Sequence, residues 1–137
     1  YEFSCTNLKS IKNIKTKEFP GYPTDLQAQL IASLLKVGQK SNITENIFEN
    51  RFIHIPELRR FGAQLDIVGN TVVINKTNDL FGAEVMATDI RASFSLIIAA
   101  IISKGTTTIN RIYHLDRGYE DFDLKLKKCG VNIKRKK

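Results

Sequence analysis

Five charged side chains occupy matching places in the sequence and are of the types that bind anions. The segments "PTDLQAQLIASLL" and "ATDIRASFSLIIAA" place Asp25 and Asp89 directly before two apolar stretches, and Arg91 follows two residues after the second acid. Arg51 and Arg117 lie in "ENRF" and "HLDRGYE", just after polar-apolar alternations. Guanidinium groups bind carboxylate and phosphate oxygens in pairs, and helix N-termini add further donors. If the chain brings these positions together, we predict a pocket for a multiply anionic ligand.

The same charges also have purely structural explanations. Both acids stand where a carboxylate caps a helix and complements its dipole, and Thr24 could cap the first helix instead. Arg51 could form an ion pair with Glu49. Arg117 could likewise pair with Asp116 or Glu120. The residue types alone leave both the binding site and the internal ion pairs open.

Arg91 is less easily explained by structure alone. It falls in the first turn of the second predicted helix, where a positive charge opposes the helix dipole by a few tenths of a kcal/mol. A bound anion at the same helix end would reverse the sign of that effect. Arg91 therefore favours the binding-site interpretation.

The two histidines indicate neither a metal site nor a catalytic motif. His54 lies between apolar residues in "FIHI", so we expect a buried structural side chain with its hydrogen bonds satisfied, and His114 lies nearer the charged motif. The sequence has no HxxxH, HExxH or paired Cys/His spacing, so we expect no metal. It also has no Gly-rich phosphate loop and no G-x-S-x-G motif.

The elements that would position the charges form a repeat. Four pairs of landmarks lie about 66 residues apart, namely Asp25 and Asp89, Gly38 and Gly105, Arg51 and Arg117, and Gly62 and Gly130. Units of this size cannot bury their apolar faces alone, so repeats of this kind pack against one another. We therefore predict one unit copied once, at about residues 11–75 and 83–137.

Each unit reads as strand, helix, strand, helix and hairpin. Hydrophobic periodicity and turn residues predict the first unit at 13–16, 25–35, 41–48, 54–62 and a hairpin over 63–74 around Gly69-Asn70. The second unit is predicted at 83–87, 90–104, 106–115 and 119–130, with 131–135 beginning another hairpin. The segment 90–104 is apolar nearly all round, which is typical of a buried helix. We predict an α/β fold of repeated βαβαββ units with the helices inside and the sheets outside.

Composition indicates a soluble globular protein. The 137 residues are the length of one domain, and 42% apolar and 26% charged residues exclude a disordered chain. The longest apolar run, 96–102, is much shorter than the roughly 20 residues of a membrane helix. The two cysteines, Cys5 and Cys129, have neither metal nor disulfide-framework spacing. We expect no membrane association and a cytoplasmic location.

The net charge of +7 comes from the C-terminal segment. Seven Lys and Arg residues lie between 125 and 137, where there is no acid, so the first 124 residues are neutral overall. No aromatic side chains interleave with these basic residues, as they do in proteins that bind single strands. We therefore interpret the charge as a solvated surface, and nucleic acid is not an expected partner.

Four stretches of the sequence resemble one family of enzymes. At "PTDLQAQ", "ITENIFENRFIHIPELRRFGA", "GAEVMATDIRAS" and "GTTTINRIYHLDRGYEDFDLKLKKCGVNI" the chain is similar to the UDP-N-acetylglucosamine enolpyruvyl transferase (1-carboxyvinyltransferase) family. The resemblance covers nearly the whole chain. It implies an inside-out α/β barrel domain in which residues 1–137 supply about two units of the C-terminal portion.

The resemblance also implies an activity. Members of the family transfer the enolpyruvyl group of phosphoenolpyruvate to the 3-hydroxyl of UDP-N-acetylglucosamine, which is the first committed step of peptidoglycan precursor synthesis. They use no cofactor, and phosphate leaves through a tetrahedral intermediate. By resemblance, Asp25 would hold and deprotonate the hydroxyl, since an attacking alcohol needs a base within hydrogen-bond reach. Ile47 would contact the sugar nucleotide.

The remaining charged positions would, by resemblance, bind phosphoenolpyruvate. Arg91 and Arg117 would hold its carboxylate and phosphate and offset the charge that develops during the reaction. Arg51 and Asp89 would support the same cleft.

The segments that carry the family's proton-donating cysteine and most of its nucleotide site have no counterpart in these 137 residues. We therefore expect the chain to need the missing N-terminal part of such an enzyme as a partner and to be inactive alone. The alternative is a non-catalytic module that binds anions or nucleic acid.

Overall fold

The computed structural model describes residues 11–136, so Cys5 and Lys137 lie outside the described residues. The first part of the chain forms β1 (Asn13–Lys15), the 3-10 helix η1 (Thr24–Leu26), α1 (Gln27–Leu34), β2 (Ser41–Thr44), α2 (Ile55–Arg60), β3 (Leu65–Val68) and β4 (Thr71–Ile74). The second part forms β5 (Glu84–Met86), α3 (Ile90–Ile102), β6 (Thr108–Asn110), α4 (Tyr113–Asp116) and α5 (Phe122–Lys128).

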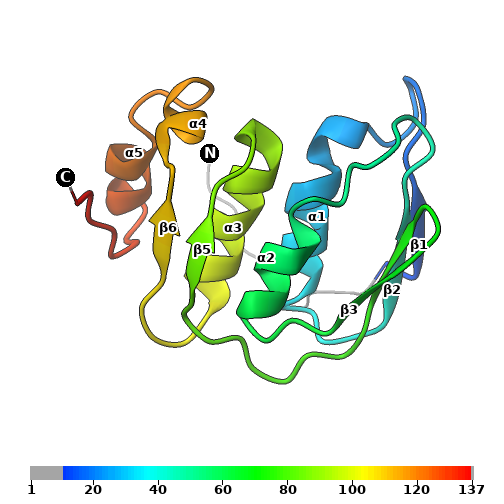
Figure 1. Ribbon diagram of the computed structural model, residues 1–137, viewed down its shortest axis with the longest axis horizontal. Coiled ribbons are helices and arrows are strands. Elements are labelled where there is room, and N and C mark those ends of the chain that lie inside the picture. The colour runs from blue at the N-terminus through cyan, green and yellow to red at the C-terminus, as the bar shows by residue number, and fades with distance from the viewer. Residues whose placement is uncertain (1–10, 137) are drawn as a thin grey trace.

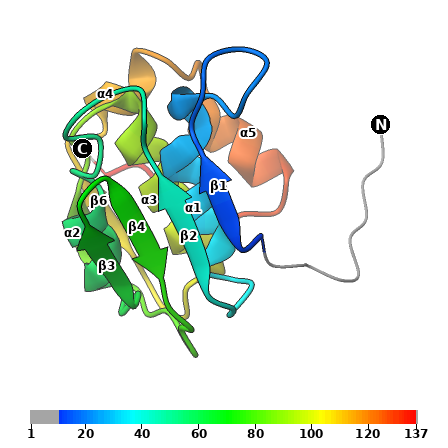
Figure 2. The same cartoon turned by 90° about the vertical axis from the view of Figure 1, so that its right-hand side faces the viewer.

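The main helices lie between two sheets. Figure 1 shows α1, α2 and α3 side by side, with the four-stranded sheet on the right and the β5–β6 pair on the left. Figure 2 views the four-stranded sheet from its outer face, with the helices behind it. This arrangement confirms the predicted α/β class with helices inside and sheets outside.

The two sheets begin with the same arrangement of strands. In the larger sheet the order is β1-β2-β4-β3, and β1 runs parallel to β2 with Ile14 opposite Ile43. In the smaller sheet β5 runs parallel to β6 with Val85 opposite Ile109. Parallel strands need a crossover, and here the crossovers contain α1 and α3, respectively. The equivalent helices of the two halves therefore become neighbours in the interior.

The hairpin and the buried helix form as the sequence predicts. β3 and β4 pair antiparallel around the two-residue turn Gly69-Asn70, where Gly69 has a φ of +58°. α3 covers nearly the whole of the predicted helix 90–104, and its buried face includes Leu96 and Ile97. α1 packs along α3 more extensively than along any other described helix or strand. Their contact, with the inner faces of β2 and β4, makes the core.

The second strand of the first repeat is shorter than predicted. The prediction of a strand over 41–48 is wrong beyond Thr44, because the residues after Thr44 leave the extended conformation. The carboxylate of Glu45 accepts hydrogen bonds from the backbone N–H groups of Ile47 (2.9 Å) and Phe48 (3.2 Å). These N–H groups are then satisfied locally and need no neighbouring strand.

The predicted strand 106–115 is also mostly wrong. Only Thr108–Asn110 pairs with β5, Arg111 has a φ of +57°, and Tyr113–Asp116 forms the helical turn α4. The apolar residues Ile109, Ile112 and Leu115 are spaced by three, which fits one face of a helix as well as an irregular alternation. Sequence alternation alone could not separate the two.

The expected strand at 131–135 does not form. In the first repeat the equivalent strand β3 pairs with β4 and reaches the sheet only through it. Within residues 11–136 no strand stands in the place of β4 in the second repeat. Without that partner the segment has no ladder to join, and Arg135 instead forms ion pairs with Asp116 and, at 3.4 Å, with Asp123.

Candidate active site

The candidate site lies where one end of each buried helix meets the loops between strands and helices. Figure 1 shows the N-terminal ends of α1 and α3, the segment between β2 and α2, and α4 gathered at the upper end of the molecule. Asp25 lies in η1 directly before α1, and Arg91 lies in the first turn of α3. Arg51 lies between β2 and α2. The repeat thus brings together three charges that are distant in sequence.

Asp25 pairs with both of these arginines. Its Oδ1 accepts a hydrogen bond from Arg91 Nε at 2.6 Å and lies 3.5 Å from Arg51 Nη1. The side chain of Asp25 is 62% exposed, so the carboxylate stays open to solvent and to ligands. The structure therefore pairs Arg51 with Asp25, whereas the sequence left a pair with Glu49 open.

The prediction that Thr24 or Asp25 caps the first helix is wrong. α1 has Leu26 at its N-cap and no side-chain capping bond. Thr24 Oγ1 instead donates to Glu45 Oε2 at 2.8 Å. A carboxylate used as a cap points back to its own helix. Since that of Asp25 is free of this role, it can point across to the second repeat.

Asp89 does cap its helix, as predicted. Its Oδ1 accepts from the backbone N–H groups of Arg91 (2.8 Å) and Ala92 (2.9 Å). The bond to Arg91 fixes the backbone of that residue, and the guanidinium of Arg91 reaches Asp25. The two acids at equivalent repeat positions thus have different roles.

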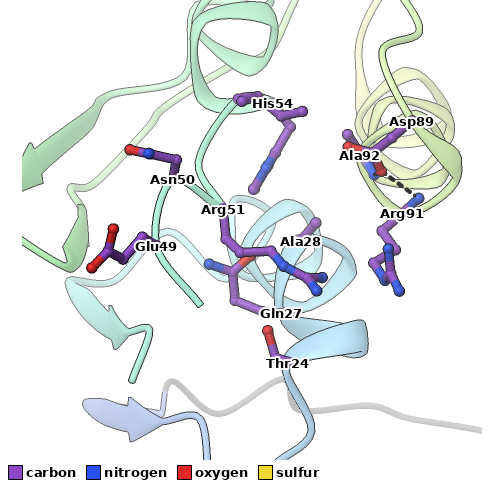
Figure 3. Close-up of a pocket in the computed structure, with 11 residues that line it drawn as sticks. Thr24, Gln27, Ala28, Glu49, Asn50, Arg51, His54, Asp89, Arg91 and Ala92 are labelled. Carbon is purple, nitrogen blue, oxygen red and sulfur yellow. Dashed lines mark hydrogen bonds between the residues drawn. The ribbon is translucent and has the colours of Figure 1, made fainter. Parts of the chain in front are cut away.

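A pocket of about 300 Å³ opens between Arg51, Asp89 and Arg91, whereas Asp25 is not one of the residues that line it. Figure 3 shows Arg51 in its centre, with Asp89 and Arg91 on α3 to one side and Gln27 and Ala28 on α1 below. Arg51 is 23% exposed and lies 4.3 Å from the centre of the Phe48 ring, which holds its guanidinium in place. Two arginines from different repeats therefore face one cavity, which suits an anionic ligand.

Ile47 lines a second, more open pocket that adjoins the first. This cavity of about 780 Å³ is bordered by the segment 45–53 and by the β3–β4 turn. Arg51 belongs to the walls of both pockets. A ligand spanning the two would contact Ile47 at one end and the arginines at the other.

Arg117 does not line either of these pockets. It follows α4, its side chain is exposed, and no ion pair of Arg117 occurs within residues 11–136. The predicted alternative partner Asp116 pairs with Arg135 instead. The next residue, Gly118, packs against Ile90, where an added Cβ would lie 3.0 Å from Ile90 Cγ2. Arg117 therefore lies near the N-terminus of α3, and no ion pair holds its side chain within the described residues. It does not belong to the group formed by Asp25, Arg51 and Arg91.

His54 is buried in the pocket wall, but it is not fully satisfied as the sequence predicts. Only 1% of the residue is exposed, and its Nε2 has no hydrogen-bond partner. Burial lowers the pKa of His54 to about 4, although Asp89 and the backbone of Arg51 act in the opposite direction. The ring is thus neutral near pH 7.

Glu45 is the residue whose importance the sequence reasoning missed. It is 3% exposed, and besides the two backbone N–H groups its carboxylate accepts from Thr16 Oγ1 at 2.8 Å and from Thr24 Oγ1 at 2.8 Å. Burial alone would raise the pKa of Glu45, but these hydrogen bonds outweigh it and lower the pKa below its usual value. A signal was present: Ser41, Ile43 and Glu45 share the inward parity of the strand, which is unusual for an acid.

Other classes of site find no support in the described structure. Within residues 11–136, no three His, Cys, Asp or Glu side chains are grouped so that they could hold a metal ion. None of the helices described there has the length and apolarity needed to cross a bilayer. Cys129 is an exposed free thiol directly after α5.

Sequence comparison finds one family and close relatives. Residues 4–126 match the family model described as EPSP synthase (3-phosphoshikimate 1-carboxyvinyltransferase). The chain is 57% identical over 129 residues to the UDP-N-acetylglucosamine 1-carboxyvinyltransferase of Pelagibacter ubique, covering 93% of this chain and 31% of the relative. It is 53% identical over 134 residues to the enzyme of that name from Campylobacter lari, covering 96% and 32%. The chain thus spans less than a third of the length of these relatives.

A solved structure has the same fold. The crystal structure of the enolpyruvyl transferase NikO from Streptomyces tendae superposes with a TM-score of 0.80 at 28% sequence identity. The match covers 89% of this chain and 28% of NikO. The likeness therefore extends over nearly all of the present fold.

Proposed function

Because the chain belongs to the EPSP synthase (3-phosphoshikimate 1-carboxyvinyltransferase) family, we propose that it supplies part of the active site of a UDP-N-acetylglucosamine enolpyruvyl transferase. The enzyme would transfer the enolpyruvyl group of phosphoenolpyruvate to the 3-hydroxyl of UDP-N-acetylglucosamine. This reaction is the first committed step of peptidoglycan precursor synthesis, carried out in the cytoplasm without a cofactor. The identity of over 50% to relatives with this name, from several bacteria, supports this substrate pair over other members of the family.

One observation carries the proposal: the carboxylate of Asp25 lies against the guanidinium groups of Arg91 and Arg51 beside an open pocket. A base and two anion-binding groups from different repeats are therefore within a few ångströms of one another. Internal ion pairs alone would not require a cavity there. The arrangement suits the meeting of a neutral hydroxyl and a multiply charged anion.

The proposed chemistry assigns the first proton transfer to Asp25. The hydroxyl oxygen attacks C2 of phosphoenolpyruvate while its proton passes to the Asp25 carboxylate, and C3 receives a proton from an acid elsewhere in the enzyme. The tetrahedral intermediate then loses a proton from C3 and breaks its C–O bond to phosphate. Arg91 would bind the carboxylate or phosphate of phosphoenolpyruvate and stabilise the charge that develops.

The other predicted residues take supporting roles in this proposal. Arg51 and Asp89 would hold the cleft, Arg51 from its wall and Asp89 through the backbone of Arg91. Ile47 would contact the sugar nucleotide in the adjoining pocket. Arg117 would turn towards phosphoenolpyruvate when it binds, since nothing in the described structure holds its exposed side chain elsewhere.

The acid that protonates C3 and most of the nucleotide site would come from the two thirds of the enzyme that this chain does not span. We therefore expect the 137 residues to release no phosphate from the two substrates when tested alone. The partner would be the N-terminal part of the same enzyme.

A chimaera tests the proposal directly. This chain would replace the matching segment of the Pelagibacter ubique relative, and phosphate release would be measured with both substrates present. We expect activity in the chimaera, a loss of at least about 100-fold in Asp25→Asn, and no loss in Asp79→Asn. Asp79 is a matched control, because it is also an exposed aspartate in an ion pair, with Lys104 at 2.7 Å. A folded chimaera without phosphate release would refute the proposed function.

A further inference from the structure

Two buried side chains in the pocket wall each leave one nitrogen atom without a partner. His54 is 1% exposed and Gln27 is 2% exposed, and both line the pocket of about 300 Å³. Neither His54 Nε2 nor Gln27 Nε2 has a hydrogen-bond partner. A buried polar group left unpaired costs about 1–3 kcal/mol. A polar atom that bonds to both groups would offset this cost.

The two nitrogen atoms differ in what they need. His54 forms a hydrogen bond with the backbone of Arg51, and because Nε2 has no partner, the ring nitrogen in that bond is Nδ1. This bond acts to raise the pKa of the ring, so the partner is the carbonyl of Arg51, which can only accept; Nδ1 therefore carries the proton and Nε2 of the neutral ring offers a lone pair. Gln27 Nε2, in contrast, is an amide donor. One vacant acceptor and one vacant donor therefore belong to residues in the wall of the same pocket.

The charged groups around the pair already have partners. Asp89 Oδ1 accepts from the N-terminus of α3, and Asp25 Oδ1 accepts from Arg91. Figure 3 shows the ring of His54 directed away from its own backbone, towards Arg51 and Gln27. The vacant pair is therefore a feature of its own within the pocket, next to the anion-binding arginines.

We propose that His54 and Gln27 form a subsite for the oxygen of an O–H group, which donates to His54 Nε2 and accepts from Gln27 Nε2. A fully ionised phosphate or carboxylate oxygen has no proton to donate to this lone pair, so the subsite would prefer a hydroxyl group or a water molecule. Anions would bind at Arg51 and Arg91 beside it. The pocket would thus bind a hydroxyl group at His54 and Gln27 and an anionic group at Arg51 and Arg91.

The inference rests on the proposed function only in one respect, the source of the O–H group. If the source is a ligand, the sugar hydroxyls of UDP-N-acetylglucosamine can supply it and phosphoenolpyruvate cannot. If the source is a water molecule, the subsite completes the pocket in the free protein. In both cases His54 and Gln27 position an oxygen without exchanging a proton with it.

The first experiment measures the tautomer of His54 by ¹⁵N NMR on the 137-residue chain at pH 7. We expect a protonated Nδ1 and a bare Nε2. A proton on Nε2 would overturn the inference, because that nitrogen would then be a donor. This measurement needs no variant and no turnover, so it stands even if the proposed function fails.

The second experiment identifies the source with the chimaera described above. If the O–H group belongs to the ligand, His54→Phe and Gln27→Met should each raise KM for UDP-N-acetylglucosamine about tenfold, because one hydrogen bond is lost. KM for phosphoenolpyruvate should be unchanged. A water molecule predicts unchanged KM values together with a long-lived water contact to the His54 ring in NMR spectra. A rise in KM for phosphoenolpyruvate alone would overturn the inference.

Gln29→Met is the matched control for Gln27→Met. Gln29 is also a glutamine of α1 with a buried amide atom that has no partner, but it does not line the pocket. We expect its KM values to equal those of the parent chimaera. A chimaera without any phosphate release would count against the proposed function, whereas the tautomer of His54 would still decide the subsite.

Discussion

Arg91 donates from Nε to Asp25 Oδ1 at 2.6 Å, although the two residues are 66 positions apart in the chain. Each stands at the start of a buried helix, and the contact joins the two repeats at the end of the molecule where the pocket opens. The pair is exposed, with 45% of the Arg91 and 62% of the Asp25 side chain accessible. Its position and exposure suggest a role in binding more than in stability.

We predict that Asp25→Asn separates stability from activity. An exposed ion pair contributes at most about 1 kcal/mol, so the free energy of unfolding of the 137-residue chain should fall by no more than that. In the chimaera the same substitution should abolish most phosphate release, because the amide cannot accept the hydroxyl proton. Urea denaturation and phosphate release measure the two effects. A loss of several kcal/mol would show that the pair is structural.

Glu45→Gln should be clearly destabilising. The carboxylate is buried and accepts four hydrogen bonds; an amide removes the negative charge that strengthens the three bonds at Oε1, and its NH₂ group forces the Thr24 hydroxyl to accept instead of donate. The expected cost is about 1–3 kcal/mol in the free energy of unfolding. Glu49→Gln, an exposed change in the same loop, should cost less than about 0.5 kcal/mol. Equal effects for the two substitutions would contradict this role for Glu45.

The lowered pKa of Glu45 also predicts an acid-sensitive fold. Its folded-state pKa lies below its unfolded value of about 4.3, so its stabilising effect is present above that pH and is lost as the pH falls through the lower, folded-state pKa. The Glu45→Gln protein should lose less stability than the parent below about pH 4. Urea denaturation at several acidic pH values measures the difference.

His54 predicts a second pH effect, in a higher range. Burial lowers its pKa to about 4, against about 6.5 in an unfolded chain, so between these values the unfolded state binds the extra proton. The free energy of unfolding should therefore decrease by roughly 3 kcal/mol from pH 6.5 to pH 4. His54→Phe should remove this slope and His114→Phe should keep it. An unchanged slope in His54→Phe would place the titrating group elsewhere.

Arg117→Ala should leave the fold intact and weaken the binding of phosphoenolpyruvate. The side chain is exposed and has no ion pair within residues 11–136, so the free energy of unfolding should change by less than about 0.5 kcal/mol. In the chimaera, KM for phosphoenolpyruvate should rise at least about tenfold, as expected for a lost charge-assisted hydrogen bond. Lys128→Ala removes the same charge from the exposed face of α5 and should leave KM unchanged.

The sequence predicted the elements that rest on strong periodicity or specific turn residues. α3 follows from an apolar run with Asp89 before it, and the β3–β4 hairpin follows from Gly69-Asn70. Predictions were wrong where a side chain competed for the backbone, as at Glu45, or where a spacing fitted two structures, as at 109–115. Such choices depend on tertiary partners that one sequence does not display.

The sequence predicted which residues form the site better than it predicted which of them are in contact. The repeat identified Asp25 and Arg51 as landmarks and the helix dipole singled out Arg91, but only the structure shows that the three side chains meet. The unpaired nitrogen atoms of Gln27 and His54 could not be foreseen, because whether a buried group finds a partner depends on positions of a few tenths of an ångström.

The two parallel strand pairs end differently. In the first repeat, β2 pairs with β1 along one edge and with β4 along the other. Among the strands of residues 11–136, β6 pairs only with β5. On the far side of β6 the backbone donors and acceptors therefore have no strand partner among the described residues, and such an edge can pair with another extended chain. The isolated 137-residue chain should consequently associate with itself as its concentration rises. The contact should form along β6 and not along β2, which already has a strand on both edges.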